Sequence, residues 1–136
     1  MKIIAVGKLQ TAGLKETFHH YYKQLKHIDI IEIKESTIEK EAADILKLIK
    51  DEKHIITLEI EGNIVDTYDF CQLFEDELST VFIIGGSHGL DQEVKAKAQH
   101  HISFSKMTFP HQLARVILIE QLFRCDKIKH HHPYHK

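Results

Sequence analysis

The chain has 136 residues, of which 43% are hydrophobic and 28% are charged, and these proportions are those of an ordinary globular protein with one core. No apolar run approaches the roughly 20 residues of a membrane span, and no signal peptide is expected. The net charge of −2 excludes a protein that coats nucleic acid by bulk electrostatics, and two cysteines predict no disulfide framework, as in a reduced, cytoplasmic protein.

Short apolar runs alternate along the chain with apolar residues at helical spacing. The predicted strands are residues 2–9, 28–34, 54–60, 80–84 and 101–106. The predicted helices are residues 14–25, 36–49, 66–78, 91–98 and 110–128. This alternation predicts one α/β domain over residues 1–136, with a mostly parallel sheet and helices on both faces.

Polar residues at three predicted helix starts are typical of caps. Ser36 and Glu39 have the spacing of a capping box, and Asp66 and Asp91 can cap the third and fourth helices. In the third helix, the residues expected to point inward are Phe70, Phe74 and Leu78.

Positive charge is concentrated near the C-terminus. From Arg115 to Lys136 there are five Lys or Arg residues and two acidic ones, a net charge of +3, so the remainder carries −5. Four of the twelve histidines also lie in the final segment "KHHHPYHK". We therefore expect an anionic partner to meet this end of the protein.

The segment "FIIGGSHGL" (82–90) joins an apolar strand to a turn with three glycines. Ligands of open parallel sheets bind beyond the carboxyl ends of the strands, so Gly85, Gly86 and Gly89 can let a ligand approach the backbone. A tight turn without a ligand explains them as well. The spacing is that of neither common phosphate-binding motif, and the carboxylate of Asp91 would repel a phosphate.

The segment "SFSKMTFPHQL" (103–113) mixes hydroxyl groups with apolar surface. This mixture suits a neutral aromatic ring held by main-chain hydrogen bonds, as adenine would be. A half-buried strand with alternating sides explains Phe104 and Lys106 equally well.

The last predicted helix is apolar on all sides from Val116 to Ile119, which indicates burial on several faces. Glu120 and Arg124 are four residues apart, so Arg124 can serve either as a simple ion-pair partner or in function. In the tail, contiguous histidines point in different directions, so we expect no metal site. The tail is either a frayed end or a segment whose aromatic and basic side chains contact a nucleic-acid base.

Three motifs carry a family resemblance. "GGSHGL", "SFSKMTFPHQLARVILIEQLFR" and "HPYHK" resemble the RlmH family, small SPOUT-class methyltransferases of bacterial large-subunit ribosomal RNA, and the resemblance extends over the whole chain. It implies a C-terminal trefoil knot that binds S-adenosylmethionine (SAM). It also implies methylation of N3 of a pseudouridine in 23S rRNA on the assembled ribosome by a cytoplasmic homodimer, with no role for DNA or a membrane.

The resemblance also assigns site residues by position. The implied cofactor contacts are Leu58, Gly85, Gly86, Gly89, Phe104, Ser105, Lys106, Met107, Thr108 and Phe109. The implied catalytic and RNA-contacting residues are Arg124, Tyr134, His135 and Lys136. Lys136 stands where many members have arginine, so it keeps the positive charge but lacks the planar fork.

Methyl transfer to N3 requires that the base lose a proton. We expect Arg124 and Lys136 to stabilise the developing anion, with His135 as the candidate for proton transfer. Two alternatives remain: a non-catalytic RNA- or ribosome-binding module with the same fold, and an α/β protein that binds a nucleotide phosphate at the glycine turn.

Overall fold

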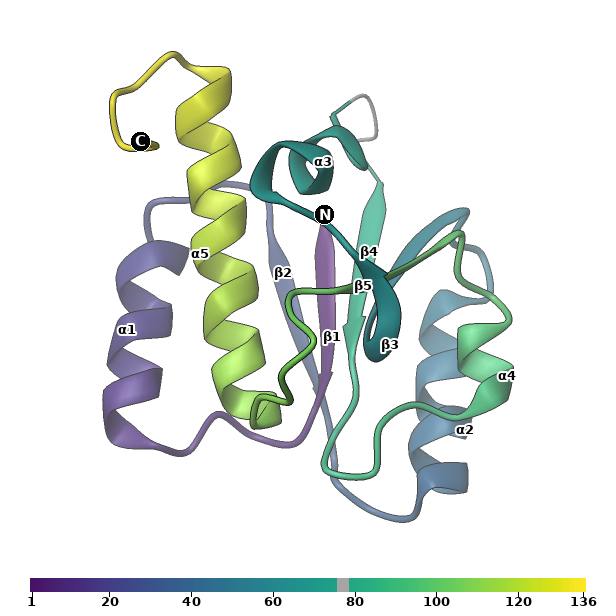
Figure 1. Ribbon diagram of the computed structural model, residues 1–136. Coiled ribbons are helices and arrows are strands. Elements are labelled where there is room, and N and C mark those ends of the chain that lie inside the picture. Colours follow the sequence, from purple (N-terminus) through teal and green to yellow (C-terminus); the bar gives the residue numbers. More distant parts are fainter. Residues whose placement is uncertain (76–78) are drawn as a thin grey trace.

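The computed structural model describes residues 1–75 and 79–136, and its centre is one five-stranded sheet (Figure 1). The strands are β1 (Lys2–Val6), β2 (Asp29–Ile33), β3 (His54–Ile64), β4 (Thr80–Ile84) and β5 (His100–Ser103). Their order is β2-β1-β4-β3-β5, and every strand pair is parallel. The α/β class is confirmed, and the sheet is parallel throughout.

Helices cover both faces of this sheet, as predicted. They are α1 (Ala12–Tyr22), α2 (Ile38–Ile49), α3 (Thr67–Gln72), α4 (Gln92–Lys95) and α5 (His111–Lys129). One apolar core joins α1, α3 and α5 to one face of the sheet, and a second joins α2 and α4 to the other (Figure 1).

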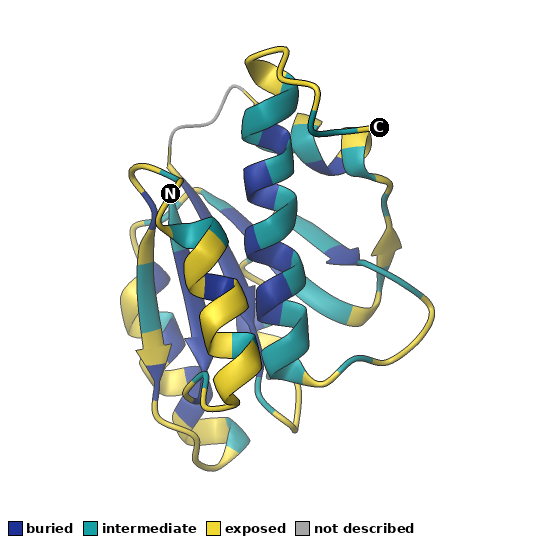
Figure 2. Cartoon of the chain, turned by 90° about the vertical axis from the view of Figure 1, so that its left-hand side faces the viewer, coloured by how far each residue is buried: buried dark blue, intermediate teal, exposed yellow. Residues whose placement is uncertain are grey.

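The burial pattern follows from this layering. All of β4 is buried because it lies in the middle of the sheet, whereas α1 exposes its outer side to solvent (Figure 2). In α5, Leu118 and Ile119 are 0% exposed. The prediction that this helix is extensively buried is therefore confirmed.

The start of α2 differs by one residue from the predicted capping box. Thr37, not Ser36, is the cap, and its hydroxyl accepts a hydrogen bond from the Lys40 amide. The Ser36 amide instead donates to the carboxylate of Glu41, at 2.8 Å. The carboxylate that accepts from this amide is thus that of Glu41, which is buried, so the predicted role of Glu39 is wrong. The predicted caps Asp66 and Asp91 are confirmed.

The fifth strand is shorter than predicted, because it ends at Ser103 rather than at residue 106. The Ser103 hydroxyl donates to the carbonyl of Ser105, and the Ser105 hydroxyl accepts from the Met107 amide. Such local side-chain bonds compete with the strand ladder and turn the chain away from the sheet. Phe104 and Lys106 therefore lie in a loop, not on a half-buried strand.

The two cysteines, from which no disulfide framework and a reduced state were expected, are bonded to each other, so the expected reduced state is wrong. Cys71 of α3 and Cys125 of α5 form a disulfide, with their Cα atoms 5.5 Å apart. The two residues are 54 positions apart in the sequence, and only the packing of α3 on α5 brings them together.

β3 curls around β5 at its carboxyl end. Ile102 of β5 pairs with both Leu58 and Asn63 of β3, with a break in register between them. A Cβ atom on Gly62 would lie 2.6 Å from the Ile102 carbonyl carbon, closer than real Cβ contacts. Gly62 is thus required by the close approach of the two backbones.

Two predictions remain, one on the inward side chains of the third helix and one on membrane spans. Leu78, predicted to point inward from the third helix, lies outside the described residues, while Phe70 is buried at 2% exposure. Among the described residues, no helix combines the length and apolar character that a membrane crossing needs.

Candidate functional site

A cavity of about 740 Å³ lies at the carboxyl ends of β3, β4 and β5. Its volume falls within the range of roughly 300–1,000 Å³ that small-molecule sites occupy. Nine of the ten implied cofactor residues line it: Leu58, Gly85, Gly86, Gly89, Phe104, Ser105, Met107, Thr108 and Phe109. Lys106 is not among the lining residues.

The glycine turn forms one wall of this cavity, and its backbone packs tightly against itself. A Cβ on Gly85 would lie 2.6 Å from the backbone of Gly89, and the Gly89 amide donates to the Gly86 carbonyl. Gly89 itself has a φ of 74°, in the left-handed region that favours glycine. The turn therefore needs these glycines whether or not a ligand lies against it.

The nucleotide-phosphate alternative is disfavoured by the residue that follows the turn. Asp91 caps α4, and its carboxylate accepts a hydrogen bond from the Glu93 amide at 2.9 Å. A negative charge already occupies the helix N-terminus where a phosphate would bind.

Arg115 holds α5 against the strand ends beside the cavity. Its side chain is 2% exposed and makes an ion pair with Glu32, while a second nitrogen donates to the Gly7 carbonyl at 2.9 Å. Its Nε–H has no hydrogen-bond partner among the described residues. The sequence contained one signal for this role, an arginine beside a wholly apolar run of helix.

The implied catalytic residues gather at the other end of α5. Arg124 pairs with Glu120 at 2.6 Å, and its guanidinium carbon lies 4.7 Å from the centre of the Tyr134 ring. The Tyr134 hydroxyl also donates to Glu120, at 2.9 Å. Glu120 therefore orients the side chains of both Arg124 and Tyr134, whereas the sequence predicted only its ion pair with Arg124.

Tyr134 is held in its neutral form. Burial raises the pKa of its phenol above the ordinary value, and hydrogen bonds with Tyr21 and Glu120 raise it further. The hydroxyl thus stays a hydrogen-bond donor at physiological pH and cannot act as a base.

His135 lies between Arg124 and α3. Its Nδ1 is 3.1 Å from an Arg124 nitrogen, and its ring meets that of Tyr68 edge-on, with centres 5.1 Å apart. Because arginine can only donate, Nδ1 accepts and the ring hydrogen lies on Nε2. Lys136 is exposed beside this cluster at the chain end.

Arg124, Tyr134 and His135 form a cluster at the C-terminal end of α5, the tail cluster. In one chain this cluster lies far from the cavity. Ala114 lines the cavity, and Arg124 follows ten residues later in the same helix. At 1.5 Å per residue, the two positions are separated by about 15 Å along the axis. One chain therefore does not bring its tail cluster to its own cavity.

Comparison with known proteins agrees with this architecture. A family model described as "Predicted SPOUT methyltransferase" matches residues 1–135. The chain is 43% identical over 145 residues to "Ribosomal RNA large subunit methyltransferase H" of Acholeplasma laidlawii, covering 100% of this chain and 99% of that protein. The protein of the same name from Parasynechococcus marenigrum is 41% identical over 138 residues, covering 99% and 95%. The chain belongs to the SPOUT methyltransferase family. Its relatives place it in the RlmH group, so the resemblance seen in the sequence is confirmed.

Solved structures share the fold of this SPOUT protein at low sequence identity. A probable methylase family protein from Haemophilus influenzae superposes with a TM-score of 0.63 at 9% identity, covering 96% of this chain and 66% of that one. The SpoU methyltransferase AviRb from Streptomyces viridochromogenes, solved in complex with AdoMet, gives a TM-score of 0.52 at 11% identity, covering 94% and 58%.

Four residues beside the cavity or the tail were not predicted from the sequence as site residues. Tyr21 and Tyr68 support the tail, and Glu59 and Lys95 line the cavity as an ion pair. None stands in a motif, so their position shows only in three dimensions. Among the described residues, no group of three or more His, Cys, Asp or Glu side chains is arranged to hold a metal ion.

Proposed function

We propose that this protein is a single-domain, cytoplasmic enzyme that uses SAM to methylate N3 of a pseudouridine in 23S rRNA on the assembled ribosome. The observation that carries the proposal is full-length identity of about 40% to proteins named ribosomal RNA large subunit methyltransferase H. The choice of N3, of pseudouridine and of the assembled ribosome follows from the motif resemblance.

The cavity fits the proposed cofactor. Its lining combines apolar side chains, including those of Leu58 and Ile102, with the loop at 104–109, whose main-chain N–H and C=O groups can form hydrogen bonds with a ligand. A site of this kind can bind a nucleoside through main-chain hydrogen bonds and apolar contacts. AviRb, which shares the fold, was solved with AdoMet bound. When bound, SAM supplies a methyl group on a positively charged sulfonium.

A trefoil knot is supported by the course of β5. Ile102 of this strand pairs with Leu58 and again with Asn63 of β3, and Gly62 allows the two backbones to touch, an irregular course that a knotted chain would require. Knots are nearly absent from proteins in general, so sequence periodicity gives no hint of one.

The separation of cavity and tail supports a homodimer with shared sites. In this arrangement the Arg124 cluster of one subunit lies over the cavity of its partner. Large apolar side chains near the cavity offer a surface for the second copy, since Ile60, Ile64 and Met107 are 60%, 53% and 73% exposed.

The tail residues have distinct roles in this proposal. The guanidinium of Arg124, fixed by Glu120, stabilises the negative charge that develops on the base as N3 loses its proton, and Lys136 adds a second cation. Placing N3 in line with the methyl group is the main task of the site. His135 remains the candidate proton acceptor, and it can accept at Nδ1 only after releasing the hydrogen bond from Arg124.

One experiment tests the whole proposal. Ribosomes from cells that lack the activity are incubated with the protein and labelled SAM, and the methylated nucleotide is located by mass spectrometry. Label at N3 of a pseudouridine in 23S rRNA is expected. If the protein binds ribosomes but neither binds SAM by calorimetry nor transfers label, the non-catalytic binding module is correct instead.

A further inference from the structure

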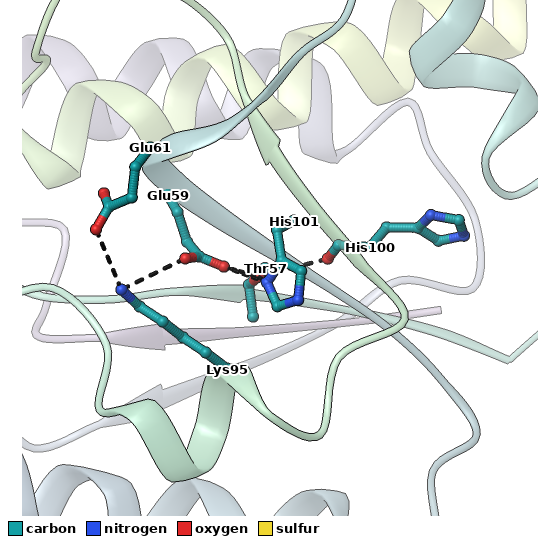
Figure 3. A network of polar contacts seen from close by, with 6 residues as sticks. All are labelled: Thr57, Glu59, Glu61, Lys95, His100 and His101. Carbon is teal, nitrogen blue, oxygen red and sulfur yellow. Dashed lines mark hydrogen bonds and ion pairs between the residues drawn. The ribbon is translucent and has the colours of Figure 1, made fainter.

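A buried carboxylate with three partners lies in the wall of the cavity (Figure 3). The side chain of Glu59 is 8% exposed and accepts hydrogen bonds from the Thr57 hydroxyl and from Nδ1 of His101. The ammonium of Lys95 lies 3.4 Å from its other oxygen and 3.3 Å from the carboxylate of Glu61.

The partners come from the three segments that enclose the cavity. Thr57 and Glu59 flank Leu58 on β3, at the start of the curl around Ile102. Lys95 ends α4, which follows the glycine turn, and His101 lies on β5, just before the loop at 104–109. One carboxylate thus ties the three walls together.

The carboxylate is held ionised. Burial by itself raises the pKa of Glu59, but the hydrogen bonds from Thr57 and His101 and the charge of Lys95 outweigh it, so the pKa lies below its ordinary value. A buried charge of this kind keeps its partners in place, because moving any of them leaves it uncompensated.

The segments joined by this network are also held by backbone pairing and by apolar packing. β3 and β5 are joined by their backbone ladder, and α4 is anchored by Val94, which is 0% exposed in the second core. Loss of the Glu59 charge should therefore loosen the walls of the cavity while leaving the sheet and both cores intact.

We propose that Glu59 is a positioning residue, whose carboxylate holds the β3 curl, α4 and β5 at the separations at which the cavity accepts its cofactor. The proposal rests on the proposed function, in which that cofactor is SAM. Glu59 acts on cofactor affinity, and the tail cluster carries the chemistry.

The test is the isosteric variant Glu59→Gln, which removes the charge at constant shape. Dissociation of SAM is measured by calorimetry, methylation is measured at saturating SAM, and the thermal midpoint is recorded. We expect SAM to bind about tenfold more weakly, as for a lost hydrogen bond to a charged group, with kcat within about twofold of wild type.

The matched control is Glu52→Gln. Glu52 pairs with Lys2 at 2.8 Å, and Lys2 begins β1, at the end of the sheet away from the cavity. This variant also loses an ion pair, here between β1 and the segment that joins α2 to β3, so it should lower the thermal midpoint without changing SAM affinity. Lys95→Met is a second test, expected to weaken SAM binding in the same direction even if Glu59→Gln fails to fold.

The outcomes separate the two proposals. If the wild-type protein binds no SAM, the proposed function fails. If the wild type binds SAM and both Glu59→Gln and Lys95→Met bind it equally well, the positioning role is refuted. A Glu52→Gln variant that loses as much SAM affinity as Glu59→Gln would also refute it, since general destabilisation would then explain the effect.

Discussion

The disulfide between α3 and α5 predicts a large dependence of stability on redox state. The bond closes a loop of 54 residues. In the chain-entropy description, a loop of this length lowers the entropy of the unfolded chain by about 14 cal/mol/K, which is about 4 kcal/mol at 25 °C. Since whole domains are stable by roughly 5–15 kcal/mol, the cross-link contributes a substantial share.

The perturbation is reduction with dithiothreitol, compared with the double variant Cys71→Ala/Cys125→Ala. Urea unfolding is followed by circular dichroism under both conditions. With a slope of about 2 kcal/mol/M, the midpoint of the wild type should fall by about 2 M on reduction. The double variant should unfold near the reduced wild type and show no response to the reductant.

Two results would refute this reasoning. One is a pair of thiols that react in the unfolded, unreduced protein, which would show that the bond does not form. The other is the same urea midpoint for oxidised and reduced wild type, which would show that the cross-link adds no stability.

Three further predictions follow from the packing and the site. Gly62→Ala places a methyl group 2.6 Å from the Ile102 backbone, so it should lower the free energy of unfolding by about 1–3 kcal/mol in urea titrations. Arg124→Ala removes the cation proposed to stabilise the anionic base, so kcat should fall about 100-fold or more in the ribosome assay while SAM affinity stays within about twofold. Ile64→Asp puts a charge on the proposed dimer surface, so sedimentation should show monomers and methylation should be lost.

Each of these variants has a matched control. Gly13→Ala adds a methyl group with nothing within 4 Å and should be neutral or stabilising in its helix. Lys47→Ala removes a positive charge from α2, on the other face of the sheet, and should leave kcat unchanged. Leu48→Asp changes a side chain that is 38% exposed on the same helix and should leave the mass of the assembly unchanged. A monomeric wild type with full activity would contradict the shared site.

The sequence predicted the class of fold because periodicity is local. The continuous apolar runs of β1 and β4 reflect burial on both faces of the sheet, and the apolar stripe of α2 reflects burial on one side of the helix, so both patterns can be counted along the chain. The predicted positions of the α2 cap and of the end of β5 were wrong by one and three residues, because Thr37 is the cap and β5 ends at Ser103. The hydrogen bonds that fix both positions involve neighbouring side chains that compete for the same backbone groups.

The motifs by themselves indicated the family and most of the cavity wall, because these residues are contiguous in short segments. Only the tertiary structure decided what joins those segments. The Cys71–Cys125 bond, the buried Arg115 and the contacts of Glu59 with Lys95 and His101 all link positions far apart in the chain. Such pairs leave no periodic signal, since each depends on how separate elements pack. The distance between the cavity and the Arg124 cluster is likewise a property of α5 in three dimensions, and it is the physical reason to expect two subunits at each site.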